Sequence, residues 1–191
     1  MASDSAGLQP NSRVVKLGLS DFHRCELLRI LQAKLLTPLF QPLVSLADGS
    51  ILGYEALIRG PSDSALHSPL LLFKTAQSFD LLEPLELLCR QMSIQAFAAA
   101  GAQGLLFLNV NPLLLLTSDH PSGLTKSYIQ QAGLAPERIV IELSEQFQVE
   151  DTELFVSAVK HYREFGFQIA IDDLGSGFSG LKLWSELQPD I

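Results

Sequence analysis

Residues 169–181 read IAIDDLGSGFSGL, an apolar run that ends in two adjacent carboxylates and a glycine-spaced loop. The run has the length and composition of a buried β-strand, and helical text follows the loop. Asp172 and Asp173 repel each other, and burying either charge is costly unless a cation, a proton or strong donors compensate it. The pair therefore predicts a compensating group at the end of this strand.

Two similar apolar runs precede this strand, LLFLNV at 105–110 and RIVIEL at 138–143, and helical segments near 126–132 and 152–165 separate the three runs. Continuous apolar strands that alternate with helices are typical of a parallel sheet. Further upstream, the turn signal ADGS at 47–50 lies between PLFQPLVSL and ILGYEALIRG, which predicts an antiparallel hairpin. The fold class is α/β, with a parallel sheet opened by a hairpin.

Three more helices are expected before the parallel strands. One is amphipathic and starts at Ser20, and the others cover residues 68–79 and 83–101. The first should pack outside the main core, with one apolar face formed by Phe22, Leu27, Leu28, Leu31 and Leu35. Residues 1–18 lack the apolar core of a signal peptide and are expected to be a mobile lead or linker, leaving residues 19–191 as the domain.

The composition of the chain disfavours two classes of binding partner, polymeric nucleic acid and membranes. The 191 residues carry a net charge of −8 and have a pI near 4.9, which disfavours binding to polymeric nucleic acid. No apolar segment reaches the length of a membrane span, so we expect a cytoplasmic chain without direct membrane contact. Cys25 and Cys89 lie far apart in helical text and are expected to be buried, reduced thiols.

Each of four apolar strand runs contains one polar residue where a core residue is expected: Glu55, Asn109, Glu142 and Asp172. Any one of them alone is as easily a helix cap or a solvated turn residue. Four together favour a site, because parallel strands place functional groups at their C-terminal ends. Three carboxylates and an amide suit hard cations, Mg²⁺ or Mn²⁺ before Zn²⁺.

Asp173 next to Asp172 suggests, from charge alone, a two-metal site that activates water against a phosphodiester. Arg59 shares the strand face of Glu55 and Leu57, where a guanidinium would hold a phosphate oxygen, although an ordinary ion pair is an equal explanation. Glu145 is placed by its spacing in a solvated turn. The four histidines lie in helical or loop text, and none is assigned to chemistry.

A rival motif occupies the opening stretch, because residues 175–180 fit the dinucleotide fingerprint G-x-G-x-x-G. A Rossmann-type oxidoreductase is therefore a remote alternative. Asp172 and Asp173 would repel a pyrophosphate at this loop, and only Asp190 lies near the place of the acidic residue that binds ribose. The glycines are better explained by a sharp turn beside metal ions.

Four segments together resemble the motifs of EAL domains, bacterial phosphodiesterases of the second messenger cyclic di-GMP. They are YEALIRG, LFLNVNP, IVIELSEQ and IDDLGSGFSGL, in the family's order and spacing. The resemblance covers residue 35 to the end of the chain. It implies a modified TIM (β/α)8 barrel with an antiparallel first strand, and hydrolysis of cyclic di-GMP to linear pGpG with Mg²⁺ or Mn²⁺.

The resemblance also implies roles for individual residues. Glu55, Asn109, Glu142 and Asp172 match ligands of a first metal ion, and Asp173 matches a ligand of the second. Glu55, Asp173 and Glu145 are the catalytic candidates, with Glu145 steadying the loop after Asp173. Gln41, Leu57 and Arg59 match substrate contacts, with Gln41 directed to guanine and Arg59 to phosphate.

The chain departs from the family pattern after LQPDI, where a lysine in a K-I-D motif and further strands are expected. The barrel is therefore expected to be incomplete at its C-terminus, and the 191-residue chain alone to bind metal weakly and hydrolyse slowly or not at all. A non-catalytic cyclic di-GMP receptor is the alternative. The text at 53–69 is similar to EAL domains that precede CBS and GGDEF modules, and the family commonly forms homodimers.

Overall fold

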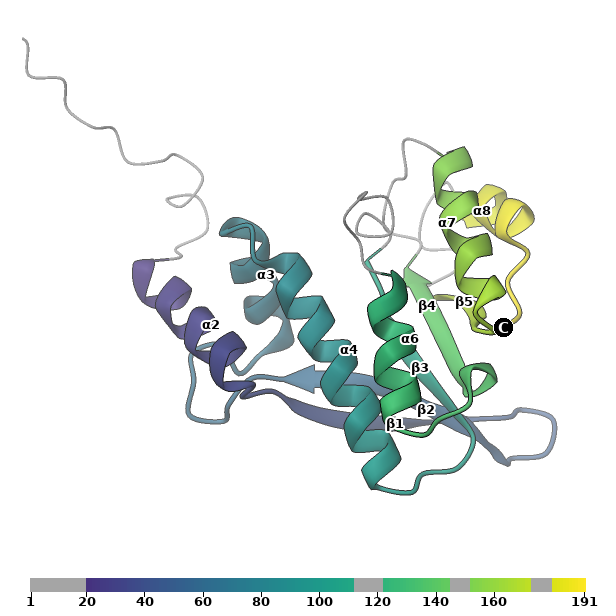
Figure 1. Cartoon of the computed structure of the whole chain (residues 1–191), viewed down its shortest axis with the longest axis horizontal. Helices are drawn as coiled ribbons and strands as arrows, with labels where there is room; N and C mark the ends of the chain where they lie inside the picture. The colour runs from purple at the N-terminus through teal and green to yellow at the C-terminus, as the bar shows by residue number, and fades with distance from the viewer. Residues whose placement is uncertain (1–19, 112–121, 145–151, 173–179) are drawn as a thin grey trace, which may run out of the picture.

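The computed structural model describes residues 20–111, 122–144, 152–172 and 180–191. Its centre is one five-stranded sheet, in which the strands follow one another in chain order (Figure 1). The strands are β1 (Thr37–Val44), β2 (Ile51–Arg59), β3 (Leu105–Asn109), β4 (Ile139–Ser144) and β5 (Gln168–Asp172). The β1–β2 pair is antiparallel and every later pair is parallel. The α/β class and the antiparallel first strand are confirmed.

The helices connect these strands as the alternating pattern predicts. They are α2 (Asp21–Ala33), α3 (Pro69–Ser78), α4 (Leu82–Ala99), α6 (Ser122–Gln131), α7 (Thr152–Glu164) and α8 (Gly180–Leu187), with a 3₁₀ turn at Pro136–Arg138. A doubly wound dinucleotide fold reverses its strand order at a switch point, whereas the described strands run β1 to β5 without reversal. None of the helices in the described ranges is long and apolar enough to cross a membrane.

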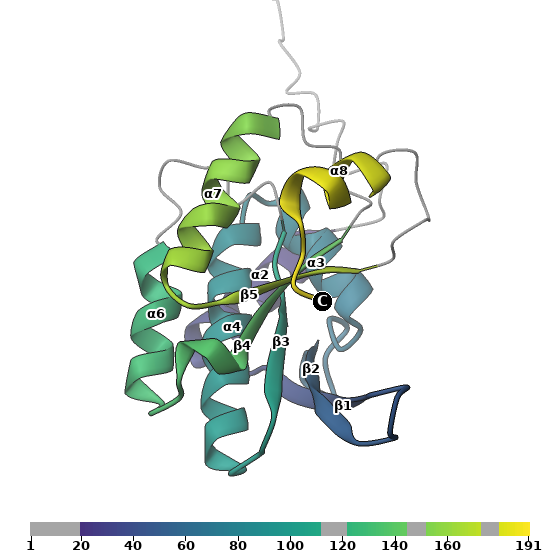
Figure 2. The ribbon, with the colours of Figure 1, turned by 90° about the vertical axis from the view of Figure 1, so that its right-hand side faces the viewer.

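The two faces of the sheet are packed differently. On the outer face, helices α4, α6 and α7 cover β2 to β5 and enclose the largest hydrophobic cluster, which includes Phe97, Leu108 and Phe155 (Figure 2). The inner face holds a smaller cluster around Phe107 and Val140. This division follows from the strand period of two, since alternate side chains point to opposite faces.

Helix α2 lies beside α3 and α4 at one end of the molecule (Figure 1). Its Leu27 and Ile30 are fully buried in a second cluster, separate from the main one, so the expected packing outside the main core is confirmed. The expected apolar face was wrong at Phe22, which is 65% exposed because no element covers the first turn on that side within the described residues.

The two cysteines differ in their surroundings. Cys89 is buried as expected, and burial raises the pKa of its thiol. Cys25 is exposed, so its expected burial was wrong. It lies on α2 between Arg24 and Glu26, on the part of the helix that faces away from the buried Leu27 and Ile30.

Candidate functional site

The predicted site residues gather on the inner face of the sheet. Glu55 pairs with Gln41 across the hairpin, and Asn109 pairs with Glu142 across the parallel β3–β4 ladder. Their strand neighbours Ala56, Leu108 and Ile141 belong to the outer, helix-covered cluster. Because neighbours along a strand alternate between faces, the polar residues lie on the inner face, opposite α4, α6 and α7.

Glu55 and Asn109 are in direct contact. The Nδ2 of Asn109 donates a hydrogen bond of 2.7 Å to Oε1 of Glu55, although the two residues are 54 positions apart in the sequence. Asn109 is the last residue of β3, whereas Glu55 is in the middle of β2. The bond fixes the Glu55 carboxylate near the C-terminal edge of the sheet. It leaves the side-chain amide oxygen of Asn109 available as a further ligand for a cation.

Glu142 and Asp172 continue this row diagonally across the sheet. Glu142 pairs with Ala170, and Asp172, two residues further along β5, pairs with Ser144. Both acidic side chains are half-buried. Residues two apart on a strand share a face, so Asp172 and Glu142 lie on the same face on neighbouring strands. The register therefore gives a row of four side chains from Glu55 on β2 to Asp172 on β5.

The donor set fits a hard cation. Three carboxylates and one amide face the same side, and no histidine or cysteine is among them, which is the chemistry that Mg²⁺, Mn²⁺ and Ca²⁺ prefer. Within the described ranges, however, no three His, Cys, Asp or Glu residues lie close enough together to hold a metal ion. Glu55 and Asp172 are separated by two intervening strands. One ion can contact both only if the sheet curves to bring their side chains together and residues next to β5 supply further ligands.

Three residues of the predicted site are on β1 and β2. Gln41 lies directly opposite Glu55, while Leu57 and Arg59 follow Glu55 at intervals of two toward the end of β2. Leu57 and Arg59 are half-buried, and Gln41 is exposed. The Arg59 guanidinium donates a hydrogen bond of 2.9 Å to the carbonyl oxygen of Ile58. All three are thus within the same row of side chains as Glu55.

The remaining predicted residues are beyond the described ranges. Asp173 and Glu145 each come directly after the last described residue of a strand, and the glycine-spaced loop occupies residues 175–180, of which only Gly180 is described. Their expected roles stay predictions.

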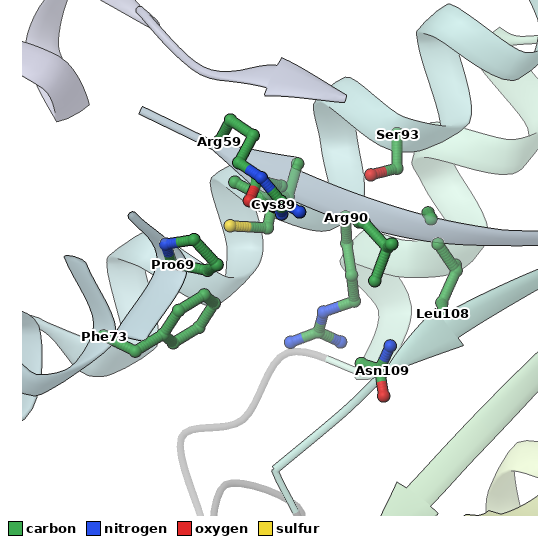
Figure 3. Close-up of a pocket in the computed structure, with 11 residues that line it drawn as sticks. Arg59, Pro69, Phe73, Cys89, Arg90, Ser93, Leu108 and Asn109 are labelled. Carbon is green, nitrogen blue, oxygen red and sulfur yellow. Dashed lines mark hydrogen bonds between the residues drawn. The ribbon is translucent and has the colours of Figure 1, made fainter. Parts of the chain in front are cut away.

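Two cavities open behind Asn109, between the strand ends and helices α3 and α4. One has a volume of about 190 Å³ and is lined by Arg59, Pro69, Phe73, Cys89, Arg90, Ser93, Leu108 and Asn109, among others (Figure 3). The other has a volume of about 510 Å³ and shares Pro69, Phe73, Cys89 and Asn109 with the first. The strand end that carries Asn109 is therefore open on its helix side as well as on its inner side.

Buried charges on α4 line these cavities, and the sequence reading missed them. Glu86 is 5% exposed and Arg90 is 2% exposed. Burial raises the pKa of Glu86 to about 7, while the positive charge of Arg90 and the backbone N–H of Asn111 oppose this rise. Arg90 donates a hydrogen bond of 3.0 Å to the buried Thr125 on α6. The signal was present in the i, i+4 spacing of Glu86 and Arg90 on the same helix face as Leu82, Cys89 and Ser93.

His67 was also missed, because it lies eight residues after the end of β2. Its ring Nδ1 is 2.8 Å from the carbonyl oxygen of Gly60, the residue that follows Arg59. His67 is in loop text as expected, but the loop returns its ring to the end of β2. A loop that folds back on itself is not visible in a local sequence pattern.

A family model described as EAL domain matches residues 24–191. The chain belongs to the EAL domain family. The fold of five described strands, with an antiparallel first strand, is that of this family's modified TIM barrel. The match begins at residue 24, and residues 1–19 are beyond the described ranges, so the domain boundary expected at residue 19 stays a prediction.

Among curated proteins, the chain is 33% identical over 156 residues to the "Probable cyclic di-GMP phosphodiesterase PdeB" of Escherichia coli. It is 26% identical to the "Blue light- and temperature-regulated antirepressor BluF" of the same organism. These matches cover 80% and 79% of this chain. The EAL chain spans only 30% of PdeB and 37% of BluF, so the relatives are much longer proteins.

Solved structures similar to this chain include EAL proteins with bound c-di-GMP. A standalone EAL protein from Vibrio cholerae in its c-di-GMP-bound form is 29% identical with a TM-score of 0.68, covering 81% of this chain and 63% of that one. PaMucR phosphodiesterase in complex with c-di-GMP has a TM-score of 0.76 at 20% identity, covering 88% and 70%. Klebsiella pneumoniae BlrP1, solved as a calcium/cy-diGMP complex, is 26% identical with a TM-score of 0.68, covering 94% and 47%.

Proposed function

We propose that this EAL domain is a phosphodiesterase that hydrolyses cyclic di-GMP to linear pGpG. One observation carries the proposal: the hydrogen bond between Asn109 and Glu55, which joins the glutamate of the family signature to the end of the neighbouring strand. Glu142 and Asp172 extend this contact into a row of oxygen donors on one face. The similarity to PdeB and to structures with bound c-di-GMP supports the same substrate.

The residues divide into two groups by their chemistry. Glu55, Asn109, Glu142 and Asp172 would hold one divalent ion, and Asp173 would contribute to a second. Bound Mg²⁺ or Mn²⁺ would lower the pKa of a water molecule and neutralise charge on the phosphate. The protein's own contribution is to hold the carboxylates in place, and Asn109 does so by its hydrogen bond to Glu55.

The second group binds the substrate. The Arg59 guanidinium, at the end of β2, has the geometry to hold a phosphate oxygen, and Gln41 would contact a guanine base from the opposite strand. Leu57 lies between Glu55 and Arg59 on the same face. It would supply an apolar contact to the substrate. Water adds to phosphorus and the P–O3′ bond breaks, which leaves a 5′-phosphate and a 3′-hydroxyl in pGpG. Glu145 would steady the loop that follows Asp173.

The family resemblance also supports a cellular location and partner domains for this chain. A cytoplasmic location agrees with a chain whose two cysteines are free thiols. We infer that the domain acts in a longer bacterial signalling protein, as a homodimer, with CBS and GGDEF modules alongside it. The acidic balance of the chain favours a small nucleotide held by local groups over a polymeric nucleic acid.

The experiment is product analysis with a single substitution. The full protein, with Mn²⁺ or Mg²⁺ and cyclic di-GMP, is expected to release pGpG, and Asp173→Asn is expected to abolish turnover, since the second ion loses a carboxylate. Cyclic di-GMP affinity, measured by calorimetry in Ca²⁺, is expected to change little in Asp173→Asn.

The outcomes separate enzyme from receptor. A wild-type protein that binds cyclic di-GMP but forms no pGpG is a receptor, and the proposed reaction is then wrong. A wild-type protein that neither binds nor cleaves the nucleotide contradicts both functions. As a control, Glu164→Gln removes an exposed contact with His161 on α7 and should leave turnover unchanged.

A further inference from the structure

The loop at residues 60–68, which connects β2 to α3, begins directly after Arg59. Gly60 uses both of its backbone groups to close this loop. Its N–H donates a hydrogen bond of 3.0 Å to the carbonyl oxygen of His67, and its own carbonyl oxygen accepts a bond of 2.8 Å from His67 Nδ1. The chain that leaves Arg59 is therefore held in one direction by two bonds to the far end of the loop.

Close packing adds to this restraint. A Cβ at Gly60 would overlap the carbonyl oxygen of Leu66, so the backbone beside Arg59 touches the opposite side of the loop. The side chain of Leu66 is fully buried. Further bonds stiffen the loop from within, because Ser64 N–H donates to the carbonyl of Pro61 and His67 N–H donates to the carbonyl of Ser64.

Helix α2 holds this loop from outside. The hydroxyl of Ser64 donates a hydrogen bond of 2.6 Å to Oε1 of Glu26, across 38 positions of sequence. Glu26 is in turn held by Arg29, whose Nε and Nη2 donate to the two carboxylate oxygens at 2.8 and 2.7 Å. These bonds lower the pKa of Glu26 to about 2, so it is ionised at neutral pH. Leu27 of α2 shares a buried cluster with Leu66.

The Arg59 side chain has little other support. Within the described ranges, the bond to the carbonyl oxygen of Ile58, its own neighbour, is the one hydrogen bond that its guanidinium makes. No carboxylate of the described residues forms an ion pair with it. The direction of the guanidinium therefore depends on the backbone at residues 59 and 60, and so on the closed loop.

We propose that Glu26 and Ser64 are positioning residues for Arg59: through the closed loop at residues 60–68, helix α2 fixes where the Arg59 guanidinium meets a phosphate of the substrate. The inference rests on the proposed function, because it assigns Arg59 to the phosphate of cyclic di-GMP. It adds that the affinity for the nucleotide is set in part by a helix that lies outside the sheet.

The test compares Ser64→Ala and Glu26→Gln with wild type in the full protein. Ser64→Ala removes the hydrogen bond to Glu26, and Glu26→Gln removes the charge that strengthens this bond and the paired contact with Arg29. KM for cyclic di-GMP is therefore expected to rise about fivefold in each variant, with kcat within about twofold of wild type. Ser64→Thr keeps the hydroxyl and should restore the wild-type KM. Glu164→Gln, which removes an exposed contact on α7, is the matched control and should leave KM unchanged.

A double-mutant cycle separates positioning from general loosening. Arg59→Ala is expected to raise KM by more than either α2 or loop variant, and Ser64→Ala should raise it no further in the Arg59→Ala background. If the two effects multiply instead, Ser64 acts independently of Arg59 and the inference is wrong. The midpoint of thermal unfolding of each variant shows whether loss of stability accompanies the change in KM.

The outcomes also separate this inference from the function on which it rests. A wild-type protein that cleaves cyclic di-GMP, together with an unchanged KM in Ser64→Ala and Glu26→Gln, overturns the inference alone. If wild type only binds the nucleotide, the same comparison is made with dissociation constants. If it does neither, both proposals fall. Hydrogen exchange of the Gly60 amide, faster in Ser64→Ala while KM stays constant, would likewise contradict the coupling.

Discussion

Asn109 connects the candidate metal ligands of three neighbouring strands. It ends β3, pairs with Glu142 on one side and donates to Glu55 on the other. A residue with one donor group and one acceptor group is suited to this place, because the donor fixes a carboxylate and the acceptor remains available to a cation. Glu55 and Glu142 alone would repel each other.

Replacement of Asn109 should therefore affect metal binding before it affects the fold. In Asn109→Ala, we expect Mn²⁺ affinity and turnover to fall by about 10- to 100-fold, since both a donor to Glu55 and an oxygen ligand are lost. Calorimetric titration of Mn²⁺ and the rate of pGpG release measure the two effects. Asn109→Asp keeps an oxygen ligand but loses the donor, so turnover at or near the wild-type rate in that variant would show that the bond to Glu55 is unimportant.

At the scale of elements, one side chain links the start of β4 to the turn between α4 and β3. Arg138, in the 3₁₀ turn before β4, donates 2.9 Å and 2.7 Å hydrogen bonds to the carbonyl oxygens of Gly104 and Ala102. Its guanidinium also lies 5.3 Å from the ring centre of Phe97 on α4. These contacts fix the start of β4 against the turn that leads into β3, and so help to align Asn109 with Glu142.

Arg138→Met is expected to lower the free energy of unfolding by about 2 kcal/mol, because two charge-assisted hydrogen bonds are lost while most of the apolar stem is kept. Urea unfolding followed by circular dichroism measures the change. Arg24→Met, at an exposed position on α2, is the matched control and should change the same quantity by less than about 0.5 kcal/mol. Equal effects of the two substitutions would contradict the structural role given to Arg138.

At the scale of the whole molecule, two carboxyl groups give the stability opposite dependences on pH. The pKa of Glu86 is raised to about 7 by burial, from 4.5. Between these values the folded state binds more protons than the unfolded state, so stability falls as the pH rises from 4.5 to 7. The pKa of Glu26 is lowered to about 2 by Arg29 and Ser64, so its contribution is present above pH 4.5 and is lost as the pH falls toward 2.

Glu86→Gln should remove most of the fall in stability between pH 4.5 and 7, which we put at about 3 kcal/mol in the wild type. Glu26→Gln should remove the acid-side loss, which is limited to about 1 kcal/mol because Arg29 is half-exposed and solvent screens the pair. Urea unfolding at several pH values gives both curves. A wild-type slope that persists in Glu86→Gln would show that another group titrates in this range.

The described sheet pairs β1 and β5 each with a single neighbouring strand. At the β5 edge, Asp190 exchanges hydrogen bonds with Ile169, its N–H donating at 2.8 Å and its side chain accepting at 2.9 Å.

The sequence by itself determined the strands, the antiparallel first pair and the polar residues that interrupt the apolar strand runs. Continuous apolar runs are local properties, so Glu55, Asn109, Glu142 and Asp172 could be recognised as polar residues in the strands of an α/β sheet before any contact was known. The family motifs, spread over most of the chain, identified the same residues.

Only the tertiary structure decided which other residues pack against the strands and loops that carry these four side chains. The burial of Glu86 and Arg90, the exposure of Cys25 and Phe22, and the return of His67 to Gly60 all depend on which elements pack together, and a local pattern does not contain that information. The bond from Ser64 to Glu26 joins α2 to the loop after Arg59 across 38 positions. Side-chain contacts between distant segments form only when the chain folds, because their energies depend on distances that sequence spacing does not fix.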